Sequence, residues 1–305
     1  MAEIWLLCEG KSDIPVLASV LTTVLAAEIT PKPSGGSSNA ASAAGFVAHN
    51  EKSVTVAYVV DRDYRRREVA EATFTDGKRC FMWRRHAIES YLLEPMVIVE
   101  AFRRFKASLV SVPGGGPAWA KGLPEDMAVV AEGLRSCAKA RAPQEAGRIA
   151  LQRLWEDLSE TAGRIQKRTA GHLGEGSPDA TLCRQSLLDE AARIVMKAQE
   201  TVASPHLVPS SIGRRYDDEF ARVSAAEYLD NLRFLEEFHG KDLLDAFLAW
   251  LQREFKSKLS YKYFVKELEA AVPVAYRANR SLYGTDDFLD LANGVRALAG
   301  LPPIA

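Results

Sequence analysis

The segment Ser53-Val54-Thr55-Val56-Ala57-Tyr58-Val59-Val60, followed directly by Asp61-Arg62-Asp63, carries the strongest strand signal in the chain. Its residues are mostly β-branched or apolar, and an acidic residue ends the run, which is typical of a buried strand. A second short apolar run, Ile4-Trp5-Leu6-Leu7-Cys8, is ended by Glu9-Gly10 and indicates another buried strand. The two runs therefore predict strands of one sheet, each followed by acidic residues.

Helical and strand patterns alternate around these two runs. Ser12 is a candidate helix cap, Pro15 suits a first helical turn, and apolar residues then recur at helical spacing, which predicts a helix over residues 13–28. Residues 30–45 predict a short strand or loop and then a helix of small residues, and residues 79–83 predict a weaker strand. This alternation predicts an α/β fold with a parallel sheet.

The pattern after Pro95 is almost entirely helical. It predicts helices over 95–106, 125–140, 143–170, 179–202, 224–237, 240–256, 260–271 and 285–299, with a loop at 203–218. We expect three regions: a catalytic core at 1–95, a helical insertion or interaction region at 96–238, and C-terminal helices at 239–305 that pack back on the core. Phe264, Phe247, Leu251 and Trp155 have the spacing of core residues.

Composition narrows the class of protein. Hydrophobic residues make up 47% of the 305 residues and charged residues 26%, which is typical of globular domains. No apolar run approaches the roughly 20 residues that span a membrane, and the four cysteines form no CxxC pair, so we expect a cytoplasmic protein without membrane contact. The formal net charge of −1 excludes a global basic field, so binding of nucleic acid would depend on local basic patches.

Four acidic residues, Glu9, Asp13, Asp61 and Asp63, follow the two strongest strands. The carboxyl ends of parallel strands gather at one edge of a sheet, and on an extended segment Asp61 and Asp63 would point to the same side. Carboxylates at such an edge repel one another unless a cation neutralises them, and an all-oxygen set favours Mg²⁺ or Mn²⁺. Such a site suits phosphodiester chemistry. Taken singly, an acid after a strand is more often a turn or capping residue than part of a site, but the set together, in order after two strong strands, favours a site.

The order of these residues resembles that of TOPRIM domains. Glu9-Gly10-Lys11-Ser12-Asp13 is similar to the first TOPRIM motif, and Val59-Val60-Asp61-Arg62-Asp63 is similar to the second, the DxD motif. Residues 84–95 and the segment His239-Gly240-Lys241-Asp242 resemble stretches of the OLD-like branch of TOPRIM nucleases, which accompany ABC-type ATPases. Within that branch, the effectors of the PARIS anti-phage system are the most similar.

The resemblance covers residues 3–95 well and 239–270 loosely, and it leaves out 107–230. It implies a TOPRIM (Rossmann-like) parallel sheet with helices on both faces. It also implies a Mg²⁺-dependent endonuclease, with tRNA favoured over other RNA and over DNA, that acts as a toxic effector under an ABC-type ATPase subunit and forms a homodimer when active. The alternative is a non-catalytic TOPRIM module that binds nucleic acid or a partner. A phosphatase-like hydrolase is the weakest alternative, because Glu9 stands where such enzymes carry an Asp nucleophile.

The resemblance also assigns roles within the site. Glu9, Asp61 and Asp63 would hold metal, with Glu9 as general base, and Asp13 and Glu89 are further candidate ligands. Catalytic contacts with phosphate are expected from Lys11 and Lys241. Basic residues near these segments are expected to bind nucleic acid, namely Arg65, Arg66, Arg67, Arg84, Arg85, Lys258 and Lys262. The alternative for each is a solvated loop or helix face, and the role of Tyr261 stays open.

Overall fold

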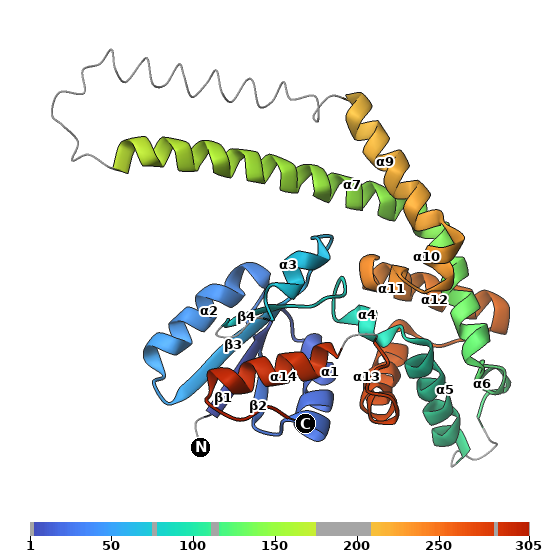
Figure 1. The fold of residues 1–305 in the computed structure, drawn as a ribbon. Coiled ribbons are helices and arrows are strands. Elements are labelled where there is room, and N and C mark those ends of the chain that lie inside the picture. Colours follow the sequence, from blue (N-terminus) through green and yellow to red (C-terminus); the bar gives the residue numbers. More distant parts are fainter. Residues whose placement is uncertain (1–2, 75–77, 111–115, 175–208, 284–285, 305) are drawn as a thin grey trace. The chain divides into compact units, whose positions relative to one another are not determined.

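The computed structural model describes residues 3–74, 78–110, 116–174, 209–283 and 286–304 (Figure 1). The chain divides into two compact units, Met1–Arg141 with Ala226–Ala305, and Ala142–Ala225. The helical stretch expected at 96–238 is thus divided, because residues 96–141 and 226–238 belong to the unit that contains the sheet. Within the described part of the chain, none of the helices combines the length and apolar composition that a membrane crossing requires.

The first unit is built on a parallel sheet with the strand order β2-β1-β3-β4. Its strands are β1 (Glu3–Cys8), β2 (Ile29–Pro33), β3 (Val54–Val60) and β4 (Cys80–Met82). In the register, Leu7 of β1 pairs with Tyr58 of β3, and Tyr58 pairs with Cys80 of β4. The α/β class and the parallel sheet are therefore confirmed. The chain leaves β1 toward β2 on one side and returns to β3 on the other, so the strand order reverses between β1 and β3.

Helices cover both faces of this sheet. On one face, α2 (Ser37–Asn50) packs through Ala44 against Leu7 and Val56. The short helix α3 (Arg67–Glu71) joins the same side of the sheet. On the other face, α14 (Asp287–Leu298) lies so close to Phe81 that a Cβ at Gly294 would be 2.5 Å from the Phe81 ring. Glycine at 294 therefore permits the approach of α14 to β4.

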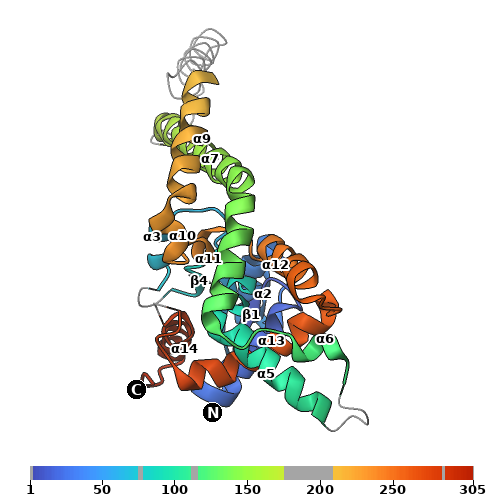
Figure 2. The same ribbon diagram turned by 90° about the vertical axis from the view of Figure 1, so that its right-hand side faces the viewer.

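The remaining helices of the first unit follow β4. They are α4 (Glu89–Leu92), α5 (Pro95–Val110), α6 (Ala118–Lys121), the first part of α7 (Met127–Gly174), α10 (Ala226–Asp230), α11 (Phe234–Glu237), α12 (Gly240–Phe255) and α13 (Tyr261–Ala278). Helices α5 and α13 lie side by side (Figure 2), and both α12 and α13 contact α4. Phe264 stacks on Phe102 and is buried, as are Phe247 and Leu251, so these core predictions are confirmed.

The second unit consists of α7 from Ala142 onward and α9 (Pro209–Ser224). Arg215 forms an ion pair with Asp157 at 2.6 Å, which links the two helices. The Trp155 side chain is 62% exposed, so the expectation that it belongs to a core is wrong. Helical spacing identifies a face of a helix but does not say whether that face is covered.

Several predicted boundaries are corrected. The α-helix that begins at Asp13 ends at Val20, and a π-helical segment (Leu21–Leu25) follows it. The expected break near residue 142 is absent, because α7 runs through Pro143 and keeps alanines buried at helical spacing on both sides of it. Residues 209–218, expected as a loop, lie in α9, while 179–202 and 203–208 lie outside the described residues. The helix expected at 224–237 is divided between the end of α9, α10 and α11, and α13 extends to Ala278.

Candidate active site

The ends of β1 and β3 are tied together by Glu9. Its carboxylate Oε1 accepts a hydrogen bond from the backbone N–H of Asp61 at 3.0 Å. This contact lies at the point where the strand order reverses, which is where doubly wound sheets bind their ligands. Burial raises the pKa of Glu9, and the charges of Asp63 and Asp13 raise it further. The two residues predicted to share an edge therefore do so.

Asp13 is buried at the first residue of α1, beside this contact. Its Oδ2 accepts from the backbone N–H of Gly10 at 3.0 Å, and its Oδ1 accepts from the Ser12 hydroxyl at 3.0 Å. Ser12 makes no side-chain cap for the helix, so the predicted capping role is corrected: its hydroxyl serves the Asp13 carboxylate. Burial raises the pKa of Asp13, and Glu89 adds repulsion.

Asp61 is the residue on which the acidic charges converge. Its pKa is raised from 3.8 to about 8, first by burial and then by the charges of Glu9, Glu89, Asp13 and Asp63. Those four carboxylates come from three segments of the chain: the segment from the end of β1 to the start of α1, the loop after β3, and the start of α4. The structure therefore brings all five predicted acidic residues into electrostatic contact.

Asp63 differs from its prediction. Its φ is 53°, in the left-handed region, so the segment after β3 is not extended and Asp63 is not aligned with Asp61 by strand geometry. Its backbone N–H donates to the His86 carbonyl at 2.9 Å. Burial raises the pKa of Asp63 overall, while Arg65 and His239 act in the opposite direction.

The loop that carries Asp61 and Asp63 is fixed by the buried residue between them. Arg62 donates from Nη2 to the Glu236 carbonyl at 2.6 Å and from Nη1 to the Arg65 carbonyl at 3.0 Å. The DxD motif by itself assigns no role to Arg62. Its burial shows that the DxD segment is anchored to α11, far along the chain.

Glu89 and Lys241 bring the C-terminal helices to the site. Glu89 begins α4 and is buried, and the Lys241 Nζ lies 3.2 Å from its Oε1. Gly240 permits this approach, because a Cβ there would be 2.9 Å from the backbone nitrogen of Ser90. The charge of Glu89 raises the pKa of Lys241. The two segments that resemble OLD-like nucleases therefore lie in contact.

Two histidines beside this contact were not predicted as site residues. His86 is buried, and its ring lies 5.1 Å from that of His239 in an edge-to-face arrangement. The Nδ1 of His239 accepts from the backbone N–H of Asp242 at 3.3 Å and so caps α12. The position of His239 directly before Gly240-Lys241 was the available signal.

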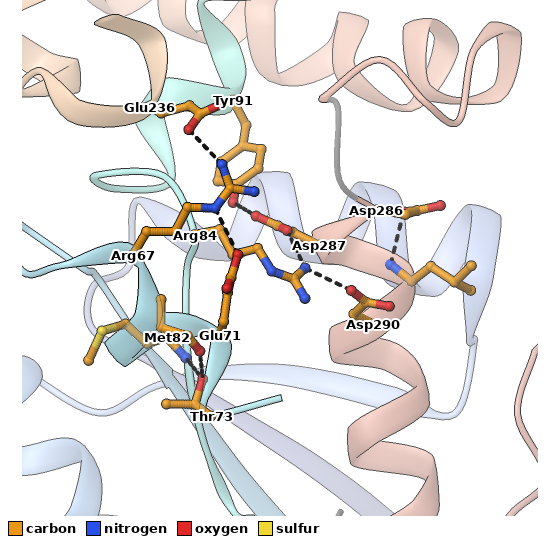
Figure 3. A network of polar contacts seen from close by, with 12 residues as sticks. Arg67, Glu71, Thr73, Met82, Arg84, Tyr91, Glu236, Asp286, Asp287 and Asp290 are labelled. Atoms are coloured by element: carbon orange, nitrogen blue, oxygen red, sulfur yellow. Dashed lines mark hydrogen bonds and ion pairs between the residues drawn. The ribbon is translucent and has the colours of Figure 1, made fainter. Parts of the chain in front are cut away.

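Three of the arginines expected to bind nucleic acid are held by carboxylates, and Figure 3 shows two of them, Arg67 and Arg84. Arg84 pairs with Asp287 at 2.6 Å and Asp290 at 2.7 Å. Arg67 pairs with Glu71 and Glu236, each at 2.9 Å, and the buried Arg85 pairs with Glu94. The binding of nucleic acid by Arg67, Arg84 and Arg85 stays a prediction, and these ion pairs weigh against it.

The other predicted basic residues lie at the surface or beside the acids. Arg65 donates to the Asp61 carbonyl at 3.3 Å, and Arg66 is exposed. Lys11, in the turn between β1 and α1, is exposed, as are Lys258 and Lys262. None of these three lysines forms an ion pair with another described residue.

The donor chemistry of the site fits a hard divalent cation. All five acids offer carboxylate oxygens; burial raises the pKa values of Glu9, Asp13, Asp61 and Asp63, and neighbouring carboxylates raise those of Glu9, Asp13 and Asp61 further. Among the residues that the structure describes, no three acidic, histidine or cysteine side chains form a group that could hold a metal ion as they stand. The Glu9, Asp13 and Glu89 carboxylates are turned toward Asp61, Gly10 and Lys241, as given above, so binding would require them to rotate.

Comparison with known proteins adds no relative: no protein-family model matches the chain, and no curated protein sequence matches it. A functional assignment therefore depends on the site and on the sequence motifs.

Proposed function

We propose that this protein is a Mg²⁺-dependent (or Mn²⁺-dependent) nuclease of the TOPRIM class. The observation that carries the proposal is the state of Asp61, whose pKa is raised to about 8 by burial and by four neighbouring carboxylates at the sheet's switch point. Folding that gathers this much negative charge is costly unless a cation binds there. Phosphodiester hydrolysis is the chemistry that carboxylate-bound Mg²⁺ most directly supports.

The five acidic residues are proposed to have two roles, metal binding and proton acceptance. Asp13, Asp61, Asp63 and Glu89 are the candidate ligands, and a bound cation would stabilise charge on the phosphate and lower the pKa of water. Glu9, held against the Asp61 N–H, has a raised pKa and is the candidate proton acceptor.

Lys241, beside Glu89, is placed to contact a phosphate oxygen. Lys11 is the second candidate for such a contact, since it is exposed in the turn that joins Glu9 to Asp13.

The finer assignment depends on the resemblance. tRNA is the favoured substrate, an ABC-type ATPase subunit is the proposed regulator, and a homodimer is the proposed active form. Support comes from the close approach of Gly240 to Ser90, which joins the two segments that carry the OLD-like resemblance. Toxicity of the chain in cells, lost in Glu9→Ala and suppressed by co-expression of such an ATPase, would support the effector role.

The direct test is cleavage of labelled RNA and DNA by purified protein in Mg²⁺ and in EDTA. Wild type is compared with Glu9→Ala, with Asp61→Asn and with Glu51→Ala, an exposed carboxylate at the end of α2. We expect loss of activity of at least about 100-fold in the two site variants, and none in Glu51→Ala. Binding without turnover in all four proteins would instead favour the non-catalytic module.

A further inference from the structure

Three exposed lysines that form no ion pair with another described residue lie close together in the sequence, near the acid site. The arginines that flank the site from α3 and from residues 84–85 are paired with carboxylates. By contrast, Lys258, Lys262 and Lys266 are exposed and form no ion pair with another described residue. These three lysines lie in and just after the turn that joins α12 to α13, which we call the α12–α13 corner (residues 256–266).

Buried side chains and side-chain-to-backbone hydrogen bonds hold the α12–α13 corner in place. Ser257 and Leu259 are buried, and the Ser257 hydroxyl accepts from the Leu259 N–H at 3.2 Å. The Ser260 hydroxyl caps α13 by accepting from the Tyr263 N–H at 3.4 Å. Phe264, one turn into the helix, is anchored in the core. Side chains on the outer face of this corner are therefore held in place by its inner face.

The α12–α13 corner also borders the acid site. Helix α4, which carries Glu89, contacts both α12 and α13. Tyr261 is the first residue of α13 and is 38% exposed. Its hydroxyl lies within electrostatic reach of Glu89 and Lys241. Tyr263 is similarly exposed, at 39%, but its ring packs edge-on against Phe105 at 5.4 Å.

We infer that the α12–α13 corner binds single-stranded nucleic acid, with Tyr261 stacking on an unpaired base and Lys258 and Lys262 holding the phosphates beside it. Exposed aromatic rings flanked by cations are how proteins grip single strands, because a base outside a duplex has a free face for stacking. A base inside a duplex has both faces covered by its neighbours, so the Tyr261 ring cannot stack on it. If the protein is the nuclease proposed above, on which this step rests, the inference names unpaired nucleic-acid strands as its substrate class.

The test is fluorescence anisotropy in EDTA, so that binding is measured without cleavage. Probes are labelled single strands of about 12 nucleotides, one RNA and one DNA, and the matching duplexes. Tyr261→Ala is compared with Tyr261→Phe, which keeps the ring, and with Phe46→Ala, which removes a 71% exposed ring from α2. The Lys258→Gln/Lys262→Gln double variant is compared with Lys52→Gln, another exposed lysine. Thermal melts check that each variant is folded.

We expect Tyr261→Ala to weaken single-strand binding by about 5- to 100-fold, and Tyr261→Phe and Phe46→Ala to leave it within about twofold. The double lysine variant should weaken binding and reduce the salt slope by about 1.4. Preference for RNA or for DNA would support the inference and assign the strand type. Equal binding by wild type and Tyr261→Ala, or duplex binding as tight as single-strand binding, would overturn it. Intact single-strand binding without Mg²⁺-dependent cleavage would refute the nuclease proposal and leave this inference standing.

Discussion

Replacing Asp61 by Asn should stabilise the metal-free protein, and by more at high pH than at low pH. Asn has nearly the shape of Asp, and the hydrogen bond from the residue 61 N–H to Glu9 belongs to the backbone and survives. The change removes only the ability to carry a negative charge. Because Asp61 has a pKa of about 8 in the folded protein against 3.8 ordinarily, the folded state keeps a proton between these pH values that the unfolded chain has lost. Wild-type stability therefore falls as pH rises from about 4 to about 8.

The size of the effect follows from the same interval. It spans roughly four pH units, and each is worth somewhat more than 1 kcal/mol, so the ceiling at pH 8 and above is about 5 kcal/mol. Glu9, Asp13 and Glu89 share the repulsion and adjust their own protonation, which lowers the expected gain to about 2 to 3 kcal/mol. At pH 5 the difference between the two proteins should be below about 1 kcal/mol.

The assay is urea denaturation in EDTA at pH 5, 7 and 9, with wild type, Asp61→Asn and Glu51→Gln. Glu51 is exposed at the end of α2, so its variant should follow wild type at every pH. The free energies of unfolding of wild type and Asp61→Asn should diverge as pH rises. If the two instead run parallel from pH 5 to pH 9, the acidic residues do not strain the folded state, and the main support for a cation site is lost.

Three further predictions concern packing, a buried ion pair and metal. Gly294→Ala should destabilise the protein by about 1 to 3 kcal/mol, because its Cβ would lie 2.5 Å from the Phe81 ring, whereas Gly45→Ala, with open space around it, should be neutral or stabilising in the same urea series. Glu94→Gln should cost about 3 to 5 kcal/mol by the same measurement, since it leaves the Arg85 guanidinium buried without its counter-charge. Added Mg²⁺ should raise the Tm of wild type by several degrees at pH 8 and by less at pH 5, where protons compete for the carboxylates. It should barely change the Tm of Asp61→Asn. A rise in Tm that does not depend on pH, or no rise, would contradict a carboxylate site.

The sheet and the gathering of acids were predictable because both depend on local signals. Apolar runs identified β1 and β3, and the rule that parallel strands present their carboxyl ends together placed Glu9 and Asp61 at one edge. No longer-range information was needed for this step. The contact of the two acidic segments follows from strand register alone.

The ion-pair partners of the charged residues were not predictable from local patterns. Arg84 and Arg85 follow β4 beside the acid site, a position that suggests phosphate binding. Their ion-pair partners, Asp287 and Glu94, are nevertheless determined by how α14 and α5 pack. The left-handed φ of Asp63 likewise occurs in a loop whose Arg62 is anchored to the Glu236 carbonyl. Such contacts join residues up to about 200 positions apart, so a local sequence pattern cannot predict them.

The C-terminal helices complete the site and do not merely cover the sheet. Arg62 reaches the Glu236 carbonyl, Lys241 reaches Glu89, and Arg84 reaches Asp287, so three segments around the acids are each tied to residues beyond 226. Residues 1–95 contain every candidate metal ligand but none of these anchors. In a fragment that ended at residue 95, the acidic loops would lack both these supports and the positive charge of Lys241, and Arg65 would still offset part of the negative charge. The compact unit that holds the acid site therefore includes the helices after residue 226 as well as the sheet.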